Sequence, residues 1–569
     1  MSTADAEVGA PSHVSQAAFD SWLRNLSDTT PLSVAALAEC DAPLMWAANS
    51  ADGSFVQLAK ELGEAGIEQS SIAELLERWL STSNERTPAS GYALECLAWA
   101  HALPELAKWL ATAPWSQLCD ELTTIARQAA RSQLLEPLPY QLLAAELPLT
   151  LGYLLPDLPG VEALSNAASE AVSRSLCEFH DGEGLPKSAH LGEYRLLLAS
   201  WTRCALIAAG ESRRVFAADA ETQYEWAVTQ TLRLTRADGG QVFSPPGEYD
   251  ASLFRAILRL VGDAKDIAAA RALLPKPKSL PAAAKPSKLR TPAIYSEWSD
   301  LAVMRTDWKR DAPQLAVGFH GGRVRSELSS RREILWSGDT TPEIEINGKK
   351  VSKIDEWEEV CWFSDADVDY LELEADLPRG WRIQRQWLLS RKDRILLHAD
   401  ALLGGGADEI GYTLRLPLNE DLRFRPGEET REAHVSGRRP LAAVMPLALP
   451  EWRVEASHGE FQNTEAGLTY RFHEKQAKAL YAPLVWDLHP TRHVKELTWR
   501  RLTVAEQLAI QPRDVAVGYR VQVGKTQWLI YRSLAEVGNR TVLGQNTTSE
   551  FICGRFSRRG QVTPLIDIE

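Results

Sequence analysis

The first half of the chain carries apolar residues at helical spacing. Such segments follow one another at 71–82, 91–111, 115–135, 140–155, 161–179, 192–210, 221–237 and 249–262. A spacing of three to four residues places the apolar side chains on one face of a helix. Gly210 and Gly262 stand where helices end. Short helices joined by brief loops are typical of an α/α toroid, so we expect an incomplete α/α barrel.

From about residue 293 the period changes from 3.6 to two. Stretches such as LAVMRTDW (301–308), YLELEADL (370–377) and QWLIYRSL (527–534) alternate or carry β-branched and aromatic runs. INGK at 346–349 predicts a two-residue hairpin, and SRKD at 390–393 predicts a second hairpin turn. Many strands at such spacing predict an antiparallel β-sandwich.

Between these halves lies a segment with neither period. Residues 273–292 contain five prolines and five basic residues, a composition typical of a semi-rigid linker. We therefore predict an α/α toroid domain at 1–272, a linker at 273–292 and an antiparallel β-sandwich domain at 293–569.

Composition limits the partners of the protein. Of the 569 residues, 45% are apolar, which is enough for two large cores, and the net charge of −14 argues against a nucleic-acid partner. No apolar run reaches the roughly 18 residues of a membrane span, and the polar, acidic start of the chain does not resemble a signal peptide. We expect no membrane partner and, by default, a cytoplasmic protein.

The seven cysteines are scattered along the chain and never form a Cys-x-x-Cys pair. This spacing predicts neither a disulfide framework nor a thiolate zinc site. We expect no metal and no cofactor.

A glycine-rich loop at 181–187 runs into a helix, where His190 and Tyr194 lie four residues apart and therefore on one face. Two interpretations are open. The imidazole and the phenol are the working pair of an acid–base site, or they are a surface histidine and a packed tyrosine.

Four stretches, in this order along the chain, resemble motifs of the heparinase II/III-like polysaccharide lyase family. They are LLAAELPLTLGYLLPDLP (142–159), DGEGLPKSAHLGEYR (181–195), RADGGQVFSPPGEYD (236–250) and YSEWSDLAVMRTDWKRDAPQLAVGFHGG (295–322). The resemblance implies a toroid followed by a β-sandwich, and β-elimination of an acidic polysaccharide or oligosaccharide. That reaction removes a proton α to a carboxylate, so the site must neutralise the carboxylate and supply a proton acceptor.

The resemblance also implies catalytic residues in the helical half. Gln141 stands where the family has an asparagine, Glu146 matches a glutamate, and Tyr194 matches a tyrosine, with His190 as a nearby imidazole. The histidine that usually follows the asparagine is Leu142 here.

In the β-sandwich the family's His-x-His-x-Asp stretch is missing, and a run of basic residues stands in its place. Because arginine forks bind carboxylate and sulfate at two points, we expect the acidic substrate to contact Arg305, Arg323, Arg325 and His320. The alternative is that these residues form a solvated strand edge.

Two other classes of function remain open. A glycoside hydrolase on the same scaffold needs two carboxylates, for which the candidates are Asp181 or Glu183 with Glu248 or Asp250. A non-catalytic glycan-binding or scaffold relative would keep the fold without the missing histidines.

Overall fold

The computed structural model describes residues 16–25, 34–48, 53–63, 69–83, 89–132, 134–156, 161–246, 249–282, 286, 288–557 and 560–569. The chain forms two compact units. The helical unit comprises Met1–Leu232, Gly247–Arg271 and Lys276–Ser287, and the β unit comprises Arg233–Pro246, Ala272–Pro275 and Lys288–Glu569. Residues 273–292, predicted as a linker, therefore contribute to both units.

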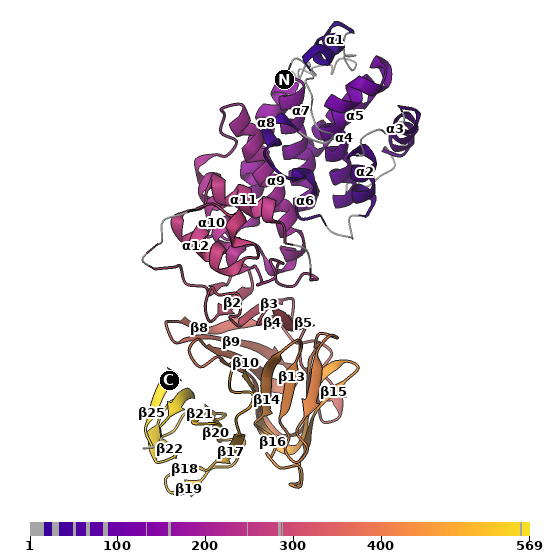
Figure 1. Ribbon diagram of the computed structural model, residues 1–569. Helices are drawn as coiled ribbons and strands as arrows, with labels where there is room; N and C mark the ends of the chain where they lie inside the picture. The colour runs from indigo at the N-terminus through magenta and orange to yellow at the C-terminus, as the bar shows by residue number, and fades with distance from the viewer. Residues whose placement is uncertain are drawn as a thin grey trace. The chain divides into compact units, whose positions relative to one another are not determined.

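The described part of the first unit is built from helices (Figure 1). They are α1 (Gln16–Asn25), α2 (Gly53–Gly63), α3 (Gln69–Ser83), α4 (Ser90–Trp109), α5 (Thr112–Arg131), α6 (Pro137–Tyr140), α7 (Leu147–Leu154), α8 (Val161–Phe179), α9 (Leu191–Gly210), α10 (Ala218–Arg233), α11 (Ala251–Leu260) and α12 (Ala264–Leu273). Every segment predicted as helical between residues 71 and 262 contains a helix. Among the described helices, none is both long enough and apolar enough to cross a bilayer.

A π-helix, Gln141–Glu146, joins α6 to α7. Pro148 at the start of α7 has no N–H to donate, and in a regular α-helix its ring would crowd the carbonyl four residues earlier. The wider π turn relieves that crowding. All six residues of the π-helix are buried.

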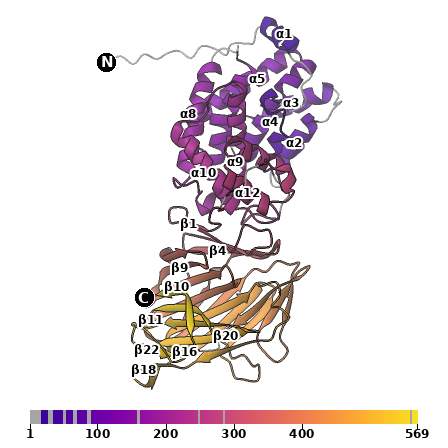
Figure 2. The same ribbon diagram turned by 60° about the vertical axis from the view of Figure 1, so that its left-hand side comes forward.

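The described part of the β unit contains four antiparallel sheets, and Figure 2 shows this unit from a second direction. The first has the order β1 (Ile294–Ser296), β2 (Leu301–Arg305), β3 (Gln314–His320), β4 (Arg323–Ser330) and β5 (Glu333–Asp339). The second has the order β12 (Arg423–Pro426), β13 (Ala433–Ser436), β14 (Pro440–Pro446), β16 (Gly467–Asp487), β11 (Ile395–Leu416), β10 (Trp381–Ser390), β9 (Val368–Leu377) and β8 (Glu358–Ser364), with β6 (Glu343–Ile346), β7 (Lys349–Lys350) and β15 (Gly459–Thr464) attached.

Two smaller sheets complete the unit. The third sheet has the order β17 (Leu497–Leu502), β20 (Ala516–Val523), β21 (Thr526–Ser533), β24 (Phe551–Phe556) and β25 (Val562–Ile568). The fourth has the order β19 (Ala509–Ile510), β18 (Val504–Glu506), β22 (Arg540–Val542) and β23 (Gln545–Thr547).

The long strands of the second sheet contribute to two apolar cores, one on each face. In β11, Leu396 and Leu402 belong to the core shared with the first sheet. Leu397 and Ala401, on the other face, belong to the core shared with the third sheet. Side chains alternate between the faces of a strand, so one strand helps to hold three layers together.

Both predicted hairpins are confirmed. Asn347 and Gly348, between β6 and β7, have φ of 51° and 72°, the pair of positive values that a type I′ turn requires. Leu389 of β10 pairs with Leu396 of β11, so the chain reverses at residues 390–395, which contain SRKD.

Candidate functional site

The register of the first sheet places the four predicted substrate-binding residues on one face. Arg305 of β2 pairs with Gln314 at one end of β3, and at the other end of β3 His320 pairs with Arg323 of β4. Residues at even spacing along a strand share a face, so Arg305, His320, Arg323 and Arg325 lie on the same side. The intervening residues, such as Met304, Val317 and Val324, face the apolar core.

The segment Arg233–Pro246 covers one end of this polar face. The Arg305 guanidinium donates to the Thr235 carbonyl, and Gln314 Nε2 donates to the Arg233 carbonyl at 2.8 Å. Arg305 is 1% exposed, and burial lowers its pKa to about 9. In this arrangement Arg305 holds the covering segment.

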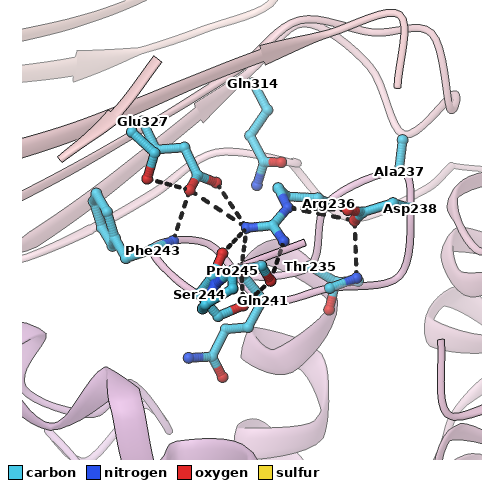
Figure 3. A network of polar contacts seen from close by, with 12 residues as sticks. Thr235, Arg236, Ala237, Asp238, Gln241, Phe243, Ser244, Pro245, Gln314 and Glu327 are labelled. Atoms are coloured by element: carbon cyan, nitrogen blue, oxygen red, sulfur yellow. Dashed lines mark hydrogen bonds and ion pairs between the residues drawn. The ribbon is translucent and has the colours of Figure 1, made fainter. Parts of the chain in front are cut away.

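Arg236 organises that segment from within, as Figure 3 shows. Its guanidinium donates to the carbonyls of Gln241, Ser244 and Pro245 and contacts the Glu327 carboxylate at 3.3 Å. A Cβ at Gly240 would lie 2.5 Å from Arg236 Nη2, so a side chain there would displace the guanidinium. The loop is therefore wrapped around one cation.

Glu327 joins the loop to the sheet. Its carboxylate accepts the Phe243 N–H at 2.9 Å and the Ser337 hydroxyl at 2.8 Å. Burial raises the pKa of Glu327, and Arg236 works against this rise. Phe243 has φ of 61°, a left-handed conformation that costs free energy for a residue with a side chain. The bond to Glu327 helps to offset that cost.

The other end of the face is open to solvent. Arg323 and His320 have side chains that are 79% and 62% exposed, and Arg325 is also exposed. His320 contacts Asp300 at 3.0 Å, Arg323 lies 3.9 Å from Asp339, and the Arg325 guanidinium lies 5.1 Å from the Phe243 ring centre. Two arginine forks and an imidazole on one exposed face suit a carboxylate or sulfate group.

In the helical unit, the two residues of the predicted acid–base pair, His190 and Tyr194, have different surroundings. His190 is half-buried at the start of α9, and its ring contacts that of Phe179. Tyr194 is fully buried, with its hydroxyl 2.9 Å from the Ala227 carbonyl and 3.0 Å from Thr231 Oγ1. Burial raises the pKa of Tyr194. The phenol is thus bonded inside the protein in this arrangement.

The other two predicted catalytic residues lie on the π-helix and are fully buried. Gln141 Nε2 donates to Ser200 Oγ at 3.0 Å. Glu146 forms a two-point ion pair with Arg203 of α9, at 2.5 and 2.9 Å. These contacts explain both residues as links between the π-helix and α9.

Two of the carboxylates considered for a hydrolase, Asp181 and Asp250, bind backbone N–H groups of their own loops, whereas Glu183 is exposed. Asp181 Oδ1 accepts the N–H groups of Glu183 and Leu185, at 2.8 and 3.0 Å. Asp250 caps α11 by accepting the Leu253 N–H at 3.0 Å. Glu248 lies outside the described residues. Within the described part of the chain, no cluster of three His, Cys, Asp or Glu side chains has the arrangement of a metal site.

Sequence reasoning missed the part played by Arg236. The only signal for it is the pair of glycines in RADGG (236–240), because consecutive glycines mark a tight turn. Its partner Glu327 is 91 residues away, too far for any local pattern to connect the two.

The two units together have the architecture of an α/α toroid followed by an antiparallel β-sandwich, as predicted, and solved polysaccharide lyases share this fold. A heparinase III superposes with a TM-score of 0.61 at 10% identity, covering 84% of this chain and 82% of that chain. The heparan sulfate lyase HepC from Pedobacter heparinus gives 0.53 at 10% identity, over 81% and 79%. A Paenibacillus xanthan lyase gives 0.50 at 10% identity, over 95% of this chain and 64% of that chain. The sequence matches no family model and no curated relative.

Proposed function

We propose that the protein is a polysaccharide lyase-like enzyme that acts on a uronic-acid-containing polysaccharide or oligosaccharide. The observation that carries the proposal is the exposed basic face of the β unit, formed by His320, Arg323 and Arg325. The fold shared with polysaccharide lyases supports the class of substrate.

In the proposed reaction the arginines hold the uronate carboxylate and neutralise its charge. This makes the proton on the adjacent carbon more acidic, because the carbanion that forms on its removal is stabilised. A base takes the proton, the glycosidic C–O bond at the next carbon breaks, and a C=C bond forms between the two carbons. The leaving oxygen receives a proton. The assignment of proton transfer to His190 and Tyr194 stays a prediction.

A second candidate is a glycan-binding protein without catalysis. One specific observation favours it: the Tyr194 hydroxyl, the Gln141 amide and the Glu146 carboxylate all have partners inside the helical unit. A group already bonded within the protein must first break that bond to meet a substrate.

One experiment separates these functions. The full-length protein is incubated with heparan sulfate, xanthan and polygalacturonate while the ultraviolet absorbance of unsaturated uronates is followed. We expect absorbance to rise with one polymer and the rise to be lost in Arg323→Ala/Arg325→Ala but kept in Arg423→Ala, an exposed arginine on β12. New reducing ends without absorbance would indicate a hydrolase. Binding with neither product would contradict the enzyme and support the glycan-binding candidate.

A further inference from the structure

A groove of about 630 Å³ opens within the β unit, at one end of the core between the second and third sheets. Its lining comes from β16, β17 and β20 and from the loop at 447–455. Figure 2 shows β20 beside β16. Buried Tyr481 and Tyr519 line the groove and also belong to that core. The groove thus lies where the second and third sheets are no longer in contact.

Basic side chains appear at core-facing positions in this groove. In β17, Leu497 and Trp499 face the core, and Arg501 is the next residue on that face. Lys475 of β16 and Arg513, just before β20, also line the groove. Among the described residues, Lys475, Arg500, Arg501 and Arg513 form no ion pair with an acidic side chain. Glu455, Glu474 and Asp514 line the same groove. Both hydrogen-bond donors and acceptors are therefore available.

An exposed tryptophan is held rigidly at the rim. Trp452 is 45% exposed and lines the groove. The Arg431 guanidinium donates to the Trp452 carbonyl and to those of Pro450 and Glu455, the latter two at 2.9 and 2.8 Å. Four backbone carbonyls in all, with that of Arg453, surround this one cation. A fixed loop presents the indole at little entropic cost.

We propose that this groove is a second carbohydrate-binding site, separate from the face formed by His320, Arg323 and Arg325. A sugar ring has an apolar C–H face that packs on an indole. Each sugar hydroxyl both donates and accepts hydrogen bonds, so it suits a lining that mixes arginine forks with carboxylates. The groove holds a section of the same polysaccharide chain away from the basic face. The identity of the polymer, though not the groove itself, rests on the proposed function.

The test uses the full-length protein in affinity electrophoresis through gels that contain heparan sulfate, xanthan or polygalacturonate. Trp452→Ala and Arg501→Ala/Arg513→Ala should each weaken retention by about tenfold or more, since truncating an aromatic or arginine anchor commonly costs that much affinity. Trp226→Ala is the matched control, because Trp226 is 43% exposed and lies in the helical unit. Thermal unfolding of every variant checks that the fold is kept.

The outcomes separate the two proposals. Retention equal to wild type in both groove variants, with loss in Arg323→Ala/Arg325→Ala, would overturn the groove and leave the proposed function standing. Loss only in the groove variants, with no elimination by wild type, would overturn the proposed function and support the groove. If wild type is retained by none of the polymers, both proposals fail.

Discussion

The predicted site residues are buried in the helical unit for the most part, whereas most of those in the β unit are exposed. In the helical unit, Tyr194, Gln141 and Glu146 are fully buried and bonded to neighbouring helices. In the β unit, His320, Arg323 and Arg325 are exposed on one face of a sheet whose other face supports them with a packed core. Substitutions in the first region should therefore act on stability, and those in the second on ligand binding.

The largest effect on stability is expected for Glu146→Ala. The change leaves the Arg203 guanidinium buried without its carboxylate, which costs about 3–5 kcal/mol in the free energy of unfolding. Urea unfolding measures this loss. Glu211→Ala is the control, because its ion pair with Arg213 is partly exposed and such pairs contribute less than about 1 kcal/mol. Equal losses in the two variants would contradict the buried role of Glu146.

Acid should destabilise the helical unit through His180. Burial lowers its pKa to about 4, whereas the unfolded chain titrates near about 6.5. The unfolded state therefore takes up the proton first as pH falls, and this contribution to stability is lost between about pH 6.5 and about pH 4. Between pH 7 and pH 5 we expect His180→Asn to lose about 2 kcal/mol less than wild type.

Unfolding free energies at the two pH values test this expectation. His398 of the β unit, whose pKa burial lowers to about 3, remains in both proteins, so wild type and His180→Asn share its effect. An identical pH dependence in the two proteins would show that folding does not lower the pKa of His180.

Substitutions on the basic face should weaken ligand binding and leave the free energy of unfolding almost unchanged. Arg323→Ala/Arg325→Ala should weaken binding of an acidic polysaccharide by about tenfold or more, since each fork that contacts an anion contributes charge-assisted hydrogen bonds. The free energy of unfolding should change by less than about 0.5 kcal/mol, as at other surface positions. Calorimetric binding and urea unfolding of the same samples measure both quantities. A large loss of stability with unchanged binding would contradict the assignment of these arginines to ligand binding.

Among the predicted site residues of the helical unit, Tyr194→Phe should reduce stability less than Glu146→Ala. Removing the hydroxyl breaks its contacts with Ala227 and Thr231, at a cost of about 1 kcal/mol. Tyr224→Phe is the matched control, because that hydroxyl is equally buried and lies 2.8 Å from Thr202 Oγ1. If Tyr194 carries a proton in an elimination, only Tyr194→Phe should also abolish that rate. An unchanged rate would contradict its catalytic assignment.

The order of the fold was predictable because periodicity is a local property. Apolar spacing located the helices, and Asn347-Gly348 located a hairpin, since both signals lie within a few neighbouring residues. The π-helix at Gln141–Glu146 was not predicted. A π turn changes the direction in which side chains point without changing the apolar composition, so a helical pattern alone does not reveal it.

The candidate site was predictable only in its charges. The run of arginines was visible, but which of them are exposed depends on pairing between strands. Arg305 and Arg325 share a face and both contact the segment Arg233–Pro246, yet only Arg305 is buried beneath it. That cover comes from residues 70 positions earlier in the chain, and no local pattern indicates it.

The second sheet packs against an apolar core on each of its faces, and this determines how the β unit unfolds. Because β11 supplies side chains to both apolar cores, peeling away either outer sheet exposes one flank of the same strand to water. Loss of one outer sheet therefore destabilises the packing of the other, so the three sheets should unfold together in one transition. A lesion in the third sheet should lower the melting temperature of the first sheet as well, and carry the basic face with it.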